Sequence, residues 1–252
     1  MVTRKSRDEI ARMRRAGRLV AEVLALVESE LRPGITTGQL DQLAEKHIRA
    51  AGAIPSFKGY GDRRNPFPAS LCISIDEEVV HGIPGTRTIR EGQLVSVDAG
   101  AIVDGWHGDA ARTFLVGQHG AEADRLVETT RLAMMAGIAA AVPGARIGDI
   151  SGAIEDVAKP AGYGIVRQFV GHGIGTEMHQ EPQVPNYRAG ARGLELVPGI
   201  CLAIEPMLTL GSYEVAIKPD GWTVVTRDGS LAAHFEHTIA VTEHGPEILT
   251  TV

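Results

Sequence analysis

The chain has 252 residues, of which 44% are hydrophobic and 22% charged, and its formal net charge is −6 at pH 7. These values argue against a protein that binds nucleic acid directly through a basic surface, and no apolar run in the sequence is long enough to span a membrane. The two cysteines, Cys72 and Cys201, cannot form a disulfide framework, and they favour a reduced, cytoplasmic protein.

Two helices are predicted at the beginning of the chain, over about residues 6–31 and 36–52. Ser6 and Glu9 have the spacing of a capping box, and apolar residues follow at helical intervals. Thr36 begins the second helix with the same spacing to a glutamine. The sequence therefore predicts a helical pair before the first strands.

The second helix recurs later in the chain. Residues 33–52 align with residues 143–162 at a constant offset of 110, with matching proline, glycine and glutamate positions. A helix-like segment, about 121–141, precedes the second copy just as the first helix precedes the first copy. One long offset predicts two related halves, since a solenoid needs several short repeats.

The similarity between the halves continues beyond the helices. "HGIP" begins at His81 and "HGIG" begins at His172, and each is followed by an apolar strand with one carboxylate. Aligning "EGQLVSVDAG" with "PGICLAIEPM" pairs Asp98 with Glu205. Each half therefore reads as two helices, a histidine, and a strand that carries an acid.

Four carboxylates lie in segments with strand patterns. Asp98 and Asp109 belong to a predicted hairpin and are expected to face each other across it. Glu205 interrupts an apolar run, and Glu236 lies in a strand predicted over residues 234–242. Buried carboxylates are normally paired or metal-bound, although each could instead face solvent on a half-exposed strand.

Two divalent ions about 3.5–4 Å apart would remove the repulsion among these acids. Oxygen ligands with an imidazole favour Mn, Fe, Co or Zn. These residues alone leave the reaction open, and a dinuclear phosphoesterase is one alternative.

The motifs in chain order resemble those of type I methionine aminopeptidases. They are "HGIP", "VDAGAIVDGWHGDAARTF", "GHGIG", "EMHQEPQVPN", "AIEPM", "DGWTVVTRDGSLAAHFEHTIAVTE" and "GPEILT", and they cover nearly the whole chain. The resemblance implies the pita-bread α/β (α+β) fold, with an antiparallel sheet inside, helices outside and two pseudo-symmetric halves. It implies one catalytic domain over 1–252, with halves of about 1–118 and 119–252, in the short bacterial form without an N-terminal zinc-binding extension.

The resemblance also implies a site with two divalent ions. Its metal ligands would be Asp98, Asp109, His172, Glu205 and Glu236, of which Asp109 and Glu236 bridge the ions. Glu205, His81 and His179 would be catalytic, and both of these histidines would contact substrate without binding metal. Water activated between the ions would attack the first peptide bond and release an initiator methionine that precedes a small, uncharged residue.

An apolar pocket for the methionine side chain is expected at Tyr60, Phe67, Cys72 and Trp222, with Met178 nearby, although ordinary core packing would explain Tyr60 and Phe67 equally well. The loop over residues 57–68 is longer than in short family members, and Phe57 and Met178 depart from residues common there. The remaining histidines are expected to be structural or solvated: His47, His107, His119, His234, His237 and His244.

The expected partners are nascent polypeptides near the ribosome, and the expected state is a cytoplasmic monomer. A proline-peptide hydrolase related to aminopeptidase P or prolidase is the nearest alternative, but those enzymes usually carry an extra N-terminal domain. A binding protein that has lost the chemistry is a second alternative, which the complete set of five ligands and two accessory histidines disfavours.

Overall fold

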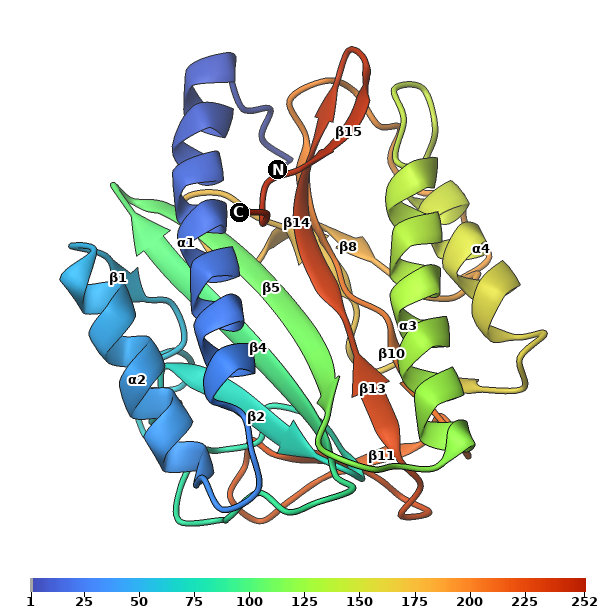
Figure 1. The fold of residues 1–252 in the computed structure, drawn as a ribbon. Helices are drawn as coiled ribbons and strands as arrows, with labels where there is room; N and C mark the ends of the chain where they lie inside the picture. Colours follow the sequence, from blue (N-terminus) through green and yellow to red (C-terminus); the bar gives the residue numbers. More distant parts are fainter. Residues whose placement is uncertain (1) are drawn as a thin grey trace.

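Antiparallel strands from both halves of the chain form one large curved sheet, with helices packed along its outside (Figure 1). The structure is a computed structural model that describes residues 2–252. The helices are α1 (Arg7–Glu30), α2 (Thr37–Ala50), α3 (Ala121–Ala140) and α4 (Ile147–Ala158). The expected arrangement of an inner antiparallel sheet and outer helices is confirmed.

The strands form three sheets. Those of the first half are β1 (Ile54–Pro55), β2 (Leu71–Ile75), β3 (Glu78–Val80), β4 (Leu94–Val103) and β5 (Trp106–Leu115). Those of the second half are β6 (Gly164–Ile165), β7 (Gly171–Gly173), β8 (Gln180–Val184), β9 (Cys201–Ile204), β10 (Met207–Thr209), β11 (Val215–Ile217), β12 (Val224–Thr226), β13 (Ala232–His234), β14 (Glu236–Thr242) and β15 (Gly245–Ile248). The large sheet has the order β1-β4-β5-β14-β9-β7-β8, with β2 added on β4 and β15 on β14, and the two small sheets are β13-β10-β6 and β11-β12-β3.

Both predicted capping boxes are present at the helix starts. The Ser6 amide donates to Glu9 Oε2 at 2.7 Å, and the Glu9 amide donates to Ser6 Oγ at 3.3 Å. The same exchange begins α2 at Thr36. These bonds satisfy amides that have no partner within the helix, so the sequence locates both starts correctly.

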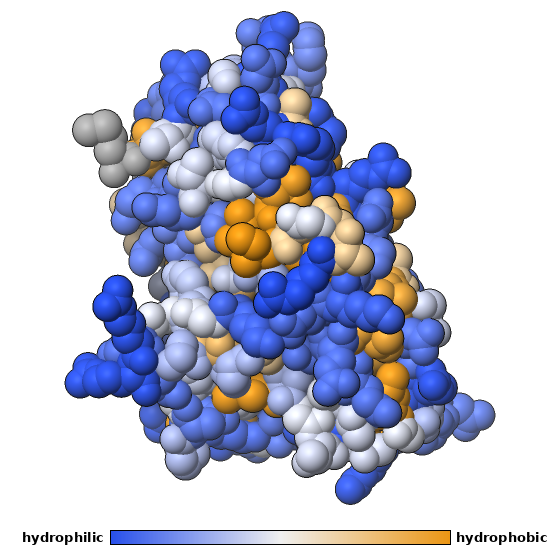
Figure 2. Space-filling view, turned by 90° about the vertical axis from the view of Figure 1, so that its left-hand side faces the viewer, coloured by the Kyte–Doolittle hydropathy of each residue, from blue (hydrophilic) through white to orange (hydrophobic). Residues whose placement is uncertain are grey.

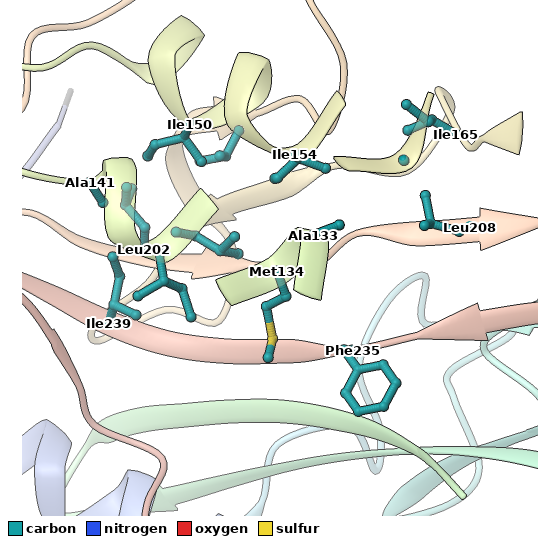
Figure 3. Close-up of a cluster of buried hydrophobic side chains, with 14 of the residues drawn as sticks. Ala133, Met134, Ala141, Ile150, Ile154, Ile165, Leu202, Leu208, Phe235 and Ile239 are labelled. Carbon is teal, nitrogen blue, oxygen red and sulfur yellow. The ribbon is translucent and has the colours of Figure 1, made fainter. Parts of the chain in front are cut away.

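Each helical pair covers its own apolar core. Under α1 and α2, alternate residues of β4 pack inward, among them Val95, Val97 and Ala99. Under α3 and α4, Figure 3 shows Ile150 and Ile154 facing the side chains of the strands below. Because β5 pairs with β14, the sheet runs without interruption from one core to the other.

Within residues 2–252, no helix has the length and apolar character needed to cross a bilayer. The side of the molecule turned toward the viewer in Figure 2 is mostly hydrophilic, with smaller hydrophobic patches between the polar groups.

Helix α1 can pack closely on the sheet because Gly108 of β5 has no side chain. A Cβ atom on Gly108 of β5 would lie 2.6 Å from the backbone nitrogen of Gly17 in α1. Close-packed interiors do not accommodate such an overlap without moving backbone. The absence of a side chain at Gly108 therefore permits this close packing of α1 on the strand that carries Asp109.

Replacing Gly108 with alanine should lower the free energy of unfolding by about 1–3 kcal/mol, because α1 must move away from β5. Chemical denaturation followed by circular dichroism measures the change. Gly85→Ala is the matched control, since no atom lies within 4 Å of the added methyl group. An unchanged midpoint for Gly108→Ala would show that this contact does not constrain the helix.

Candidate metal centre

Three neighbouring strands bring carboxylates to one region of the large sheet. Asp98 in β4 pairs with Ala111 in β5, and Ala111 pairs in turn with Glu236 in β14. Asp109 lies two residues before Ala111 and is opposite Gly100. The two aspartates are therefore diagonal neighbours on one face and not the directly opposed pair that the sequence predicted. Diagonal side chains remain within reach of each other, while direct opposition of like charges is avoided.

Glu205 and Glu236 lie at points where the chain passes between the large sheet and a small sheet. Glu205 follows β9 directly, and Pro206, which has no amide proton for a strand ladder, separates β9 from β10. The prediction of one continuous strand over 234–242 is wrong. The chain leaves the small sheet after β13, passes through Phe235 and enters the large sheet with Glu236 as the first residue of β14. The break arises because β13 pairs with β10, whereas β14 pairs with β5 and β9. The local sequence pattern carries no information about these distant pairings.

His172 reaches the same region from β7. Its Nδ1–H donates to the Gly173 carbonyl at 2.9 Å, which leaves the Nε2 lone pair free, and Nε2 lies 3.4 Å from Glu205 Oε1. The flanking glycines let β7 fit between its neighbours, because a Cβ on Gly171 or Gly173 would collide with a backbone carbonyl of an adjacent segment. The glycine-rich run around His172 is thus a requirement of close strand packing.

The four carboxylates have little contact with water and few partners. Burial raises the pKa of Asp98 to about 7. Burial, followed by repulsion from neighbouring carboxylates, raises the pKa values of Asp109, Glu205 and Glu236 well above their usual range. Among the described residues, no group donates a hydrogen bond to Asp98 Oδ1, Asp109 Oδ1 or Glu236 Oε1. Such a cluster must either take up protons or bind cations.

The donors fit a divalent cation. Asp109, His172 and Glu236 can each offer one ligand atom, all within 4.8 Å of one another, and the three residues are buried. Carboxylate oxygens with one imidazole nitrogen suit Mn, Fe, Co or Zn. Cys72 lies beside the cluster, but burial raises the pKa of its thiol well above the usual range, which disfavours a thiolate ligand.

One cavity joins all of the site residues that the sequence analysis named. It is lined by Tyr60, Phe67, Cys72, His81, Asp98, Asp109, His172, Met178, His179, Glu205, Trp222 and Glu236, and also by Phe57. The cavity is therefore acidic at one end and apolar at the other.

The apolar end is built from aromatic and sulfur-containing side chains. Phe67 and Trp222 meet edge to face with their ring centroids 5.2 Å apart, and Trp222 Nε1–H donates to the Asn65 carbonyl at 3.1 Å. Asn65 also donates to the carbonyl of Asp220. The loop over residues 57–68 is thereby tied to the segment that carries Trp222, and three of its residues line the cavity.

Two histidines stand between the acidic and apolar ends. Burial lowers the pKa of His81 to about 4 and also lowers the pKa of His179. Both rings are therefore neutral near pH 7, and each can either donate or accept a hydrogen bond. His81 holds a left-handed backbone conformation, with φ of 60°, which is uncommon for a residue with a Cβ.

His234 is the main residue near the site that the sequence analysis did not select. Its side chain is 2% exposed, Nε2 lies 3.8 Å from Glu205 Oε2, and no described residue bonds that nitrogen. With Glu205 and Glu236 it forms a second group of possible ligand atoms. In the sequence, its position two residues before Glu236 was the one indication that it lies near the site.

The other histidines have separate surroundings: His107 contacts Ser56, His237 contacts Thr250, His119 contacts Asp124, His47 lies near Glu22, and His244 is exposed.

A buried group of carboxylates and an imidazole, open to a partly apolar cavity, defines a metal-dependent hydrolase site. Comparisons with known proteins identify its family. The profile of metallopeptidase family M24 matches residues 11–243. A methionine aminopeptidase from Clostridium acetobutylicum is 52% identical over 99% of both chains, and methionine aminopeptidase 1 from Bacillus subtilis is 46% identical over the full length of both. The crystal structure of methionine aminopeptidase from Thermotoga maritima superimposes with a TM-score of 0.96, at 42% identity and full coverage of both chains.

The chain therefore belongs to metallopeptidase family M24 and, within it, to the methionine aminopeptidases. The family and the pita-bread fold predicted from the sequence are confirmed. As a metallopeptidase, the protein uses divalent metal, for which the carboxylate cluster supplies suitable donors.

Added Mn²⁺ should raise the melting temperature of metal-stripped protein, since an ion that binds only the folded state at 100 times its Kd contributes about 2.7 kcal/mol. Glu236→Gln should lose most of this gain. Without metal, however, the variant should be at least as stable as wild type, because it has one buried acid fewer. Differential scanning fluorimetry with and without Mn²⁺ measures both effects.

Glu122→Gln, which neutralises an exposed acid at the start of α3, is the control and should respond to Mn²⁺ as wild type does. An equal Mn²⁺-dependent gain in Glu236→Gln would remove Glu236 from the ligand set.

Proposed function

We propose that this protein removes the N-terminal methionine from polypeptides whose second residue is small and uncharged. One cavity supports this proposal, because it is lined by both apolar side chains and the carboxylate cluster. A methionine side chain placed against Phe67, Trp222 and Met178 would leave its own carbonyl carbon near the cluster. Flexible sulfur-containing and aromatic side chains pack well against a thioether.

We assign two divalent ions to the cluster, with Mn, Fe, Co or Zn all compatible with the donors. Asp109 and Glu236 would bridge the ions, Asp98 would hold one, and His172 with Glu205 would hold the other. When bound, such ions activate a water molecule as a nucleophile and polarise the peptide carbonyl. The unpaired oxygens of Asp98, Asp109 and Glu236 support this assignment.

The protein groups around the cluster would move protons and hold the peptide. Glu205 would accept a proton from the attacking water and later return it to the leaving nitrogen. His179 would donate a hydrogen bond to the carbonyl oxygen as negative charge develops there, a contribution that is often large in such sites. His81, half-buried beside Trp222 and Phe169, would place the peptide or protonate its leaving amine.

The cellular role follows from this substrate. We infer that the protein acts as a cytoplasmic monomer on chains emerging from the ribosome, and that residues 1–252 form a single catalytic domain. The uninterrupted pairing of β5 with β14 supports the single domain, because neither half alone contains all the proposed ligands.

Methionine should be released from Met-Gly-Met-Met but not at a comparable rate from Met-Leu-Met-Met, and only after a divalent ion is added to metal-stripped protein. The larger leucine would meet the cavity wall next to the scissile bond. Amino acid analysis of each reaction, with one added ion at a time, measures the release. A phosphomonoester serves as the control substrate, and hydrolysis of the ester in place of the peptides would favour a phosphoesterase.

Glu205→Gln should lower kcat by about a hundredfold or more, the usual scale for loss of a general acid–base group. KM for Met-Gly-Met-Met should change far less, because the substitution leaves unchanged the side chains that are proposed to hold the peptide. Steady-state kinetics at saturating Mn²⁺ separates the two constants. A variant with normal kcat would show that another group accepts the proton.

A further inference from the structure

Tyr60 and His179, which are 119 residues apart, meet at the edge of the cavity. The Tyr60 hydroxyl lies 2.6 Å from His179 Nδ1, and the ring centroids are 5.2 Å apart at an angle of 49°. No described residue forms another hydrogen bond with the His179 ring. The contact therefore leaves Nε2 as the ring nitrogen available to a substrate.

We propose that Tyr60 is a positioning residue that fixes the tautomer of His179, so that Nε2 carries the proton and faces the reaction as a hydrogen-bond donor. A neutral imidazole has one donor and one acceptor nitrogen, and the partner of one nitrogen sets the role of the other. With the phenol donating to Nδ1, the ring proton must lie on Nε2. The inference rests on the proposed function, in which His179 stabilises charge on the substrate carbonyl oxygen.

The direction of the hydrogen bond matters for this role. If Nδ1–H donated to Tyr60 instead, Nε2 would present a lone pair, which would repel a carbonyl oxygen that is gaining negative charge. A phenol is a stronger donor than a neutral imidazole, so donation from Tyr60 is favoured. Burial, together with nearby Asp109 and Glu177, raises the pKa of Tyr60, which keeps the hydroxyl proton in place at neutral pH.

The backbone around Tyr60 holds the hydroxyl in position. The Tyr60 amide donates to the Phe57 carbonyl at 2.9 Å, and the Tyr60 carbonyl accepts from the Phe67 amide at 2.8 Å. On the other side, the rings of His179 and His172 are 4.3 Å apart between centroids. Tyr60 thus connects an anchored loop to a histidine that lies directly beside a proposed metal ligand.

The role is distinct from that of a wall of the methionine pocket. A residue that only lines the pocket would contact the methionine through its aromatic ring, which Tyr60→Phe retains. A positioning role requires the hydroxyl group, which Tyr60→Phe removes. Tyr213→Phe is a matched control, since Tyr213 is 41% exposed and Tyr60 is 40% exposed, and Tyr213 stacks on Arg167 outside the cavity.

The experiment compares wild type, Tyr60→Phe, Tyr213→Phe, His179→Ala and the Tyr60→Phe/His179→Ala double variant on Met-Gly-Met-Met at saturating Mn²⁺. Tyr60→Phe should lower kcat about three- to tenfold, the value of one hydrogen bond, with KM changed less than about twofold. Tyr213→Phe should match wild type. In the His179→Ala background, removing the Tyr60 hydroxyl should have no further effect.

Imidazole ¹⁵N NMR of the metal-stripped protein provides a reading that is independent of turnover, with His179→Ala identifying the signal. Wild type should show the proton on Nε2 of His179, and Tyr60→Phe should shift the ring toward a mixture of tautomers. A proton on Nδ1 in wild type, or an unchanged spectrum in Tyr60→Phe, would overturn the inference. So would a further loss of kcat when Tyr60→Phe is added to His179→Ala, if that loss equals the one that Tyr60→Phe causes in wild type. Absence of peptide hydrolysis by wild type would instead refute the proposed function, and the NMR result would still decide the tautomer.

Discussion

Four carboxylates with little access to water lie in one region of the large sheet, where they repel one another. Asp98, Asp109, Glu205 and Glu236 come from different segments of the sheet, and hydrogen bonds from the described residues do not balance their charge. Leaving an ionised acid in such surroundings costs several kcal/mol unless a cation or a proton compensates for it. A bound divalent ion would compensate for this charge and would also serve catalysis, because the same positive charge activates water.

The fold provides this cluster where strands of the first and second parts of the chain meet in the large sheet, at the pairing of β5 with β14. β4 and β5 contribute the aspartates, while β7, β14 and the end of β9 bring the histidine and the glutamates. A small residue between the acids allows their side chains to face the same space. Ala111 lies between Asp98 and Glu236, so no bulky side chain fills the space between these two acids. The helices remain outside, where their apolar faces support the sheet without entering the cavity.

Neutral groups beside the charged cluster complete the site. His81 and His179 are kept uncharged near neutral pH by burial, and the aromatic loop over residues 57–68 is fixed by bonds to the segment around Trp222. A neutral imidazole can donate toward a developing negative charge without adding repulsion to nearby cations. The proposed assignment separates two tasks, with metal bound at the carboxylates and the substrate held by the histidines and the aromatic side chains.

The sequence predicted those features that depend on local pattern. The capping residues Ser6 and Thr36 located the helix starts, and the internal repeat indicated that the chain consists of two related halves. The strand register, the break at Phe235 and the burial of His234 depend on pairing between distant segments, which periodicity does not record. The family motifs named the candidate site residues, and the structure brings them to one cavity, but the Tyr60–His179 bond was visible only in three dimensions.

Anomalous diffraction from crystals grown with Mn²⁺ would test most directly whether divalent ions balance the charge of the carboxylate cluster. We expect two anomalous peaks about 3.5–4 Å apart, both within ligand distance of Asp109 and Glu236. One peak should also contact Asp98, and the other should contact His172 and Glu205. Peaks confined to the protein surface, or a cluster that remains free of manganese at saturating concentration, would show that divalent ions do not balance these carboxylates.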